Sequence, residues 1–170
     1  MVENAWWVME YGEPCRECGF EWAMSPEAAI AAVEALPDQF ATQLADRSGE
    51  ELGPGATWSA KAYVFHVADN LRIFAERLEG VAAGGSTAIA PYDENQLAAA
   101  RDYEAMSLPS ALWSLRTAAA VWVQASRAAL IRPTLYQHPE RGELTAAEIV
   151  RGPAHDALHH FWDVTRAVTH

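Results

Sequence analysis

The sequence predicts an all-α protein, a four-helix bundle. Apolar residues recur at helical spacing in four long segments, and these segments begin and end at residues typical of helix boundaries. No segment shows the alternation of a convincing β-strand. A chain of 170 residues is long enough for one domain with its own hydrophobic core. Long amphipathic helices joined by loops of varied length then pack as a bundle.

Capping residues and helix breakers set the expected boundaries. Ser25 is an N-cap, and Pro37 bends or splits the helix that follows it. Gly80 ends the second helix, and Thr145 with Glu148 forms a capping box that opens the last one. The tripeptide "RGP" interrupts this last helix, and "TLYQHPERGE" before it is a turn-rich connection. We expect four long helices at about 26–47, 58–79, 108–131 and 145–168, and a short one near 94–104.

Residues 1–24 form an N-terminal segment ahead of the bundle, which spans residues 25–170. The segment contains Cys15 and Cys18 in a C-x-x-C motif, which is typical of half a zinc site, a redox pair or a disulfide. A closed structural zinc site usually needs four ligands, and the chain has no second cysteine pair. We favour a reduced pair that shapes a turn before Gly19 over a reactive or metal-binding pair.

Charge excludes several classes of partner. The net charge is −11, with 23 acidic against 12 basic residues, and Lys61 is the only lysine. Without a basic stripe to neutralise phosphates, the chain is not expected to bind nucleic acid or an anionic membrane surface. No stretch approaches about 18 consecutive apolar residues, the minimum for a membrane span. The N-terminus lacks the pattern of a secretory signal, so we expect a cytoplasmic protein.

The stretch "HDALHHFWD" near the end of the chain concentrates histidines on one helix. His155 and His159 are four residues apart and lie within about 40° of each other on the helix surface, so both imidazoles can reach one ion. His160 lies about 140° away from His155 and cannot easily share that ion. Trp162 and Arg166 continue the stripe of His155 and His159, which indicates the wall of a polar cleft.

A third histidine lies on the second helix. His66 shares a face with Asn70 and Arg77, away from the apolar side. Together with His155 and His159 it would make an open three-histidine metal site with positions left for water or substrate. The spacing alone is a weak signal, because a single histidine on a helix is usually an ordinary hydrogen-bonded residue.

Two segments are similar to a known family. "WSAKAYVFHVAD" and "HDALHHFWDVTR" resemble the two signatures of the DinB-like superfamily, whose four-helix bundles include bacillithiol and mycothiol S-transferases and mycothiol-dependent maleylpyruvate isomerases. The resemblance covers most of the chain, including "PYDENQLAAARDY". In that family one histidine of the second helix and two of the last bind a divalent metal, which implies His66, His155 and His159 here. The family pattern does not explain the stretch "CRECGFEW". This stretch could fold over the mouth of the cleft.

Other polar residues near these histidines have two interpretations each. Asp69 either orients a ligand imidazole or is an ordinary helix residue, and Asp163 either holds His160 or, like Asp156, forms a salt bridge or a cap. Arg166 could pair with a substrate carboxylate or with a surface acid. The candidates for supporting the ligands or contacting a substrate are Asp69, Asn70, His160, Trp162, Asp163 and Arg166.

The resemblance implies a metal-dependent enzyme that activates a low-molecular-weight thiol, such as mycothiol as co-substrate, or water. The activated group would attack a small electrophilic substrate, which describes an S-transferase, an isomerase or a hydrolase. The alternative is a non-catalytic bundle that binds a small ligand or a metal. Three neutral histidines favour zinc, with nickel or iron as alternatives, and we expect Cys15 and Cys18 to lie outside the metal's coordination sphere. The sequence leaves the oligomeric state open, a homodimer included.

Overall fold

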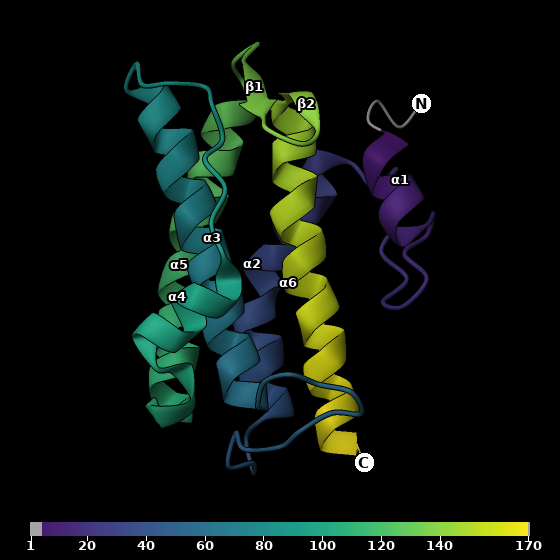
Figure 1. Cartoon of the computed structure of the whole chain (residues 1–170), viewed down its shortest axis with the longest axis vertical. Coiled ribbons are helices and arrows are strands. Elements are labelled where there is room, and N and C mark those ends of the chain that lie inside the picture. The colour runs from purple at the N-terminus through teal and green to yellow at the C-terminus, as the bar shows by residue number, and fades with distance from the viewer. Residues whose placement is uncertain (1–4, 170) are drawn as a thin grey trace.

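Four long helices form the body of the molecule, as predicted (Figure 1). The computed structural model describes residues 5–169. The bundle helices are α2 (Pro26–Gln43), α3 (Ala60–Ala82), α5 (Leu108–Leu130) and α6 (Ala146–Thr169). The most extensive contact joins α3 to α5, and α2 lies between α5 and α6. No helix within the described residues combines the length and apolar character needed to cross a membrane.

The helix starts follow the predicted caps, whereas some of the ends differ. Ser25 accepts a hydrogen bond from the backbone N–H of Ala28 at 3.1 Å, which satisfies one of the free donors of the first turn of α2. Pro37 lies inside α2 without splitting it, and Gly80 lies inside α3, which continues to Ala82. The apolar faces of these helices meet in one core, to which α2 contributes Ala29, Ile30, Val33, Leu36 and Phe40.

Helix α6 is continuous, and the predicted interruption at residues 151–153 is wrong. Thr145 and Glu148 form the predicted capping box: the Thr145 backbone N–H donates to Glu148 Oε2 at 2.8 Å, and the Glu148 N–H donates to Thr145 Oγ1 at 3.3 Å. Gly152 has a packing role, because a Cβ atom there would lie 3.0 Å from the ring of Trp7. The small residue therefore lets the N-terminal segment approach α6 rather than ending the helix.

A short hairpin precedes α6, where the sequence analysis expected only a turn-rich connection. Strands β1 (Leu135–His138) and β2 (Gly142–Thr145) are antiparallel, with Tyr136 opposite Leu144. Both of these side chains are buried. The predicted all-α bundle with little strand is confirmed. The hairpin itself was not recognised, because strands of four residues beside Pro139 are too short for alternation to stand out.

Two further helices lie outside the four-helix body. Helix α4 (Glu94–Arg101) is followed by a 3-10 turn at Tyr103–Ala105, and the left-handed Asp102 (φ 50°) separates them within the region predicted as one helix. Helix α1 (Ala5–Tyr11) was not predicted. Figure 1 shows it beside α6, with the rest of the N-terminal segment descending from it in a loop.

Candidate functional site

Helix α6 presents two pairs of metal-ligating side chains that are offset by one residue. His155 and His159 form one i, i+4 pair, and Asp156 and His160 form the other. An offset of one residue rotates the second pair by about 100° around the helix axis. The two pairs therefore meet different neighbours, and each neighbour adds its own ligands.

Asp156 and His160 face α3 and meet His66 there. We call these three residues the open cluster. One oxygen or nitrogen atom from each lies within 4.8 Å of those of the other two. His66 Nε2 lies 3.3 Å from Asp156 Oδ2, and His160 Nε2 lies 3.6 Å from Asp156 Oδ1. The two imidazole rings are nearly perpendicular, with centroids 4.8 Å apart. Both Nε2 atoms thus point at the same carboxylate.

Neighbouring groups fix the geometry of the open cluster. His160 Nδ1 lies 2.9 Å from Asp163 Oδ2, the contact suggested by the sequence. Tyr63 stacks on the His160 ring at 4.9 Å, and Trp58 packs against His66 at 5.2 Å. A carboxylate that accepts a hydrogen bond from Nδ1–H keeps the proton on that nitrogen. Nε2 of His160 is then the atom that can bind a metal.

Opposite charges dominate the electrostatics of the open cluster. Burial alone would raise the pKa of Asp156, but His66 and His160 outweigh burial and hold that pKa well below its usual range. Burial alone would lower the pKa of His160, but Asp156 and Asp163 outweigh it and raise the pKa to about 9. In the absence of a cation, Asp156 is therefore an anion that holds a proton on His160.

The open cluster lines a cavity of about 600 Å³. Aromatic rings, including those of Trp58, Tyr63 and Tyr92, form part of its wall, and Arg77 and Arg141 add positive charge. Asn70 donates a hydrogen bond to the Tyr92 hydroxyl at 3.1 Å, while its own side-chain oxygen is buried without a hydrogen-bond partner among the described residues. The cavity can hold a molecule of the size of a small substrate.

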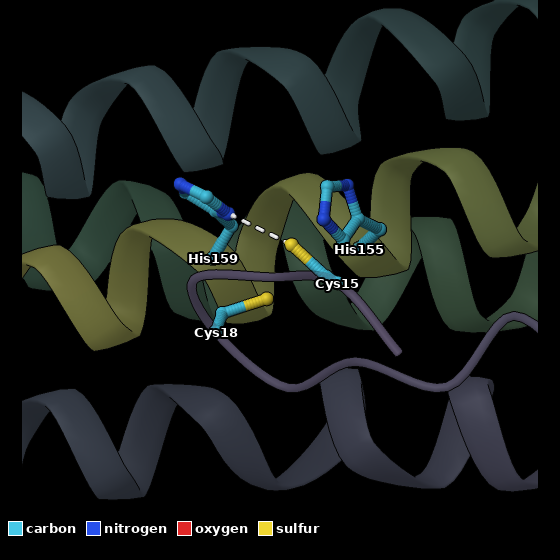
Figure 2. Close-up of side chains that lie close together, drawn as sticks. All are labelled: Cys15, Cys18, His155 and His159. Carbon is cyan, nitrogen blue, oxygen red and sulfur yellow. Dashed lines mark hydrogen bonds between the residues drawn. The ribbon is translucent and has the colours of Figure 1, made fainter. Parts of the chain in front are cut away.

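His155 and His159 face the N-terminal segment and meet Cys15 and Cys18. We call these four residues the sulfur cluster. One ligand atom from each lies within 4.8 Å of those of the other three, and Cys15 Sγ is 3.9 Å from His159 Nδ1 (Figure 2). The sequence led us to expect the two cysteines outside the metal's coordination sphere, but the structure brings their sulfur atoms beside His155 and His159. The sequence separation of more than a hundred residues concealed a contact that exists because the segment folds back along α6.

The ionisation of Cys18 is unlike that of a reactive thiol. Both cysteines are free thiols. Burial raises the pKa of Cys18 to about 11, although the backbone N–H of Phe20 opposes the shift. Reactive cysteines have lowered values instead. Burial also lowers the pKa of His155 to about 4, which keeps its imidazole neutral at pH 7.

The three predicted ligands are therefore divided between two clusters. His66 joins Asp156 and His160, whereas His155 and His159 join the two cysteines. From the sequence, Asp156 was expected to form a salt bridge or a cap. Its spacing of four residues from His160 was the signal that could have identified it. All three predicted histidines nevertheless line the same cavity. Metal binding by His66, His155 and His159 as one set stays a prediction.

Three other residues that the sequence suggested as supporting or substrate-binding groups, Asp69, Trp162 and Arg166, belong to neither cluster. Asp69 accepts hydrogen bonds from the Tyr103 hydroxyl at 2.6 Å and from Arg101, and these partners place its carboxylate in a buried ion-pair network. Trp162 packs against His159 at 5.6 Å between ring centroids, and the Arg166 guanidinium lies over the Trp162 ring at 4.4 Å. Neither Trp162 nor Arg166 lines the cavity.

Two solved structures share this fold. YfiT from Bacillus subtilis, described as a probable metal-dependent hydrolase with an unusual four-helix bundle topology, aligns with a TM-score of 0.65 and 18% identity over 83% of this chain and 86% of its own. The mycothiol-dependent maleylpyruvate isomerase aligns with a TM-score of 0.63 and 14% identity over 83% of this chain and 61% of its own. The chain thus spans less than two thirds of the isomerase.

These likenesses confirm the predicted four-helix bundle fold. No protein-family model matches the chain, and no curated protein matches its sequence.

Proposed function

We propose that this protein is a metal-dependent enzyme in which a thiol or a water molecule, bound at the open cluster, attacks a small electrophilic substrate in the adjoining cavity. One observation carries the proposal: His66, Asp156 and His160 direct one ligand atom each towards a common point on the cavity wall. Three protein ligands beside a cavity leave coordination positions for a reactant.

The donor atoms fit a divalent cation. Two ligand atoms that each lie about 2.0–2.1 Å from one tetrahedral ion are about 3.3 Å apart. The observed separations, 3.3 Å from His66 Nε2 to Asp156 Oδ2 and 3.6 Å from His160 Nε2 to Asp156 Oδ1, are close to this value, although each imidazole faces a different oxygen of the carboxylate. Asp156 Oδ2 is buried, yet it makes no hydrogen bond of acceptable geometry. His66 Nε2 lies 3.3 Å from this oxygen, and a divalent cation between the two atoms would give the buried carboxylate a stronger partner. Two imidazoles with one carboxylate suit zinc or ferrous iron, and zinc remains our preferred ion.

The residues around the open cluster hold and orient the reactants. When bound there, a divalent ion supplies a Lewis acid that lowers the pKa of a thiol or water. Asp163 accepts a hydrogen bond from Nδ1–H of His160, which keeps the proton on Nδ1 and leaves Nε2 available. Trp58 and Tyr63 cover the two imidazoles and restrict the access of bulk water. Arg77 and Arg141 line the same cavity, where their charges favour a substrate or thiol that carries a carboxylate.

The two similar structures support both versions of this chemistry. YfiT is described as a probable metal-dependent hydrolase, which matches the use of water, and the isomerase depends on mycothiol, which matches the use of a thiol. We favour the thiol, with mycothiol as co-substrate, because a cavity of about 600 Å³ has room for a small thiol and an electrophile together.

The test is an activity assay on untagged protein loaded with zinc, nickel or iron. Conjugation of mycothiol to a reactive electrophile and hydrolysis of a small ester would be measured in parallel. We expect His66→Ala and Asp156→Asn to abolish turnover. Asp38→Asn, which removes an exposed partner of Arg116, is the matched control and should keep full activity. Unchanged activity in both cluster variants would refute the proposal.

A further inference from the structure

The geometry points to a second metal centre. We propose that Cys15, Cys18, His155 and His159 bind one structural zinc ion, which fastens the N-terminal segment to α6. This centre is separate from the open cluster, and the proposal does not depend on the proposed enzymatic function. It gives a role to the C-x-x-C motif, which the fold of the bundle does not explain.

The four ligand atoms already lie close together. All of them are within 4.8 Å of one another, and Cys15 Sγ is 3.9 Å from His159 Nδ1. Zinc bonds of about 2.3 Å to sulfur and about 2.0 Å to nitrogen place these two atoms about 3.5 Å apart. Small side-chain shifts therefore suffice to bind an ion. Cysteines three apart and histidines four apart are also common spacings in Cys₂His₂ zinc sites.

The backbone around the cysteines forms a turn that brings the two sulfur atoms close together. The Gly19 N–H donates to the Cys15 carbonyl at 2.9 Å, and the Cys15 N–H donates to the Phe20 carbonyl at 2.8 Å. Gly19 has a φ of +75°, which favours glycine, and completes the turn. Figure 2 shows the two sulfur atoms of this loop facing the imidazoles that α6 presents.

An unsatisfied nitrogen supplies independent support. His155 is only 4% exposed, and its Nε2 has no hydrogen-bond partner among the described residues. Its ring lies among those of Tyr11, Phe20 and Trp22, at centroid distances of 4.6, 5.3 and 4.5 Å. Burying an imidazole among aromatic rings without satisfying its polar atoms is costly, and a metal ion removes that cost.

The partner of His159 favours metal binding through its other nitrogen. Glu17, which lies between the two cysteines, places Oε2 at 3.3 Å from His159 Nε2. A carboxylate at Nε2 keeps the proton there and leaves Nδ1, the atom that faces Cys15 Sγ, free to bind zinc. The same short loop thus provides two ligands and orients a third.

Four protein ligands leave no position for a substrate, so the site is structural. The ion would hold the aromatic part of the N-terminal segment against the bundle. Trp7 stacks on Trp22 at 4.9 Å, and Trp7 and Tyr11 both line the cavity. The zinc centre would therefore fix one wall of the cavity.

The first test uses cobalt in place of zinc in the wild-type, full-length, untagged protein. A tetrahedral site with two thiolates gives intense visible absorption together with a thiolate-to-cobalt charge-transfer band in the near ultraviolet. We expect this band in the wild type and in His66→Ala/His160→Ala, and its loss in Cys15→Ser/Cys18→Ser. A cobalt-loaded wild type without the charge-transfer band would overturn the proposal.

A second measurement avoids variants that fail to fold. A thiol-modifying reagent would be added to the zinc-loaded wild type, and released zinc would be followed with a chromogenic chelator. We expect one zinc ion to be released for each pair of thiols modified. Modification of both thiols with no release of zinc would show that the cysteines are not ligands.

Discussion

The open cluster and the sulfur cluster each contain an i, i+4 pair from α6, and the two pairs are offset by one residue. The residues around the two pairs are nevertheless very different. The open cluster has three potential ligands and borders a cavity. Two of these ligands, Asp156 and His160, carry opposite charges. The sulfur cluster has four, and its buried histidine is packed among aromatic rings. The comparison shows that the neighbouring segment decides the chemistry, because α3 adds a single histidine, whereas the N-terminal loop adds two thiols and completes a coordination sphere.

The largest expected effect comes from removing the thiols. In Cys15→Ser/Cys18→Ser we expect the described part of the N-terminal segment, residues 5–24, to detach from α6, because zinc binding to small sites contributes on the order of 10 kcal/mol. Hydrogen exchange would show lost protection of the backbone N–H groups of residues 15 and 19, which donate hydrogen bonds within the cysteine loop in the structure. Unchanged protection in this variant would mean that packing alone holds the segment.

The next effect separates neighbouring histidines. His160→Ala should lose the readily exchanged ion and all activity while it keeps the tightly held zinc, because a ligand is missing only from the open cluster. His159→Ala should show the reverse pattern of metal content. Elemental analysis before and after dialysis against a weak chelator measures both. If His160→Ala and His159→Ala lost the same ion, the two clusters would have to form one metal site.

These two clusters also mark how far the sequence could predict the structure. Periodicity and caps identified all four bundle helices, because helix formation depends on local spacing. On α6 the sequence identified only one of two candidate pairs. His155 and His159 satisfy the i, i+4 rule, and Asp156 and His160, which satisfy it equally, were not identified as a pair. Which pair faces α3 depends on how the helices are rotated in the bundle. That rotation is a tertiary property, as is the return of the cysteine loop to α6.

A smaller effect is expected from Asp163→Asn, which weakens the acceptor at His160 Nδ1 without removing a ligand. Loss of such a supporting carboxylate typically costs about 10- to 100-fold in metal affinity. Competition with a fluorescent chelator would report the change for the open cluster. The cobalt charge-transfer band of the sulfur cluster should be unaffected, and its loss would indicate a general disruption of α6.

The smallest effect on metal is expected from Asp69→Asn, since this carboxylate binds Tyr103 and Arg101 instead of a histidine. We expect full metal content and a decrease of about 1–3 kcal/mol in the free energy of unfolding, because a buried charged hydrogen bond is lost. Urea denaturation and elemental analysis of the same sample check both. Loss of metal from this variant would restore the role of Asp69 as a support for His66.

The most direct test of the account is the number of metal ions per chain, measured by native mass spectrometry on protein purified without a tag and loaded with zinc. Two separate clusters predict two ions in the wild type, one in His66→Ala/His160→Ala, one in Cys15→Ser/Cys18→Ser, and none when all four substitutions are combined. A wild type with a single ion that is retained by the cysteine variant and lost in His66→Ala would contradict the account. That result would instead favour one shared site of His66, His155 and His159.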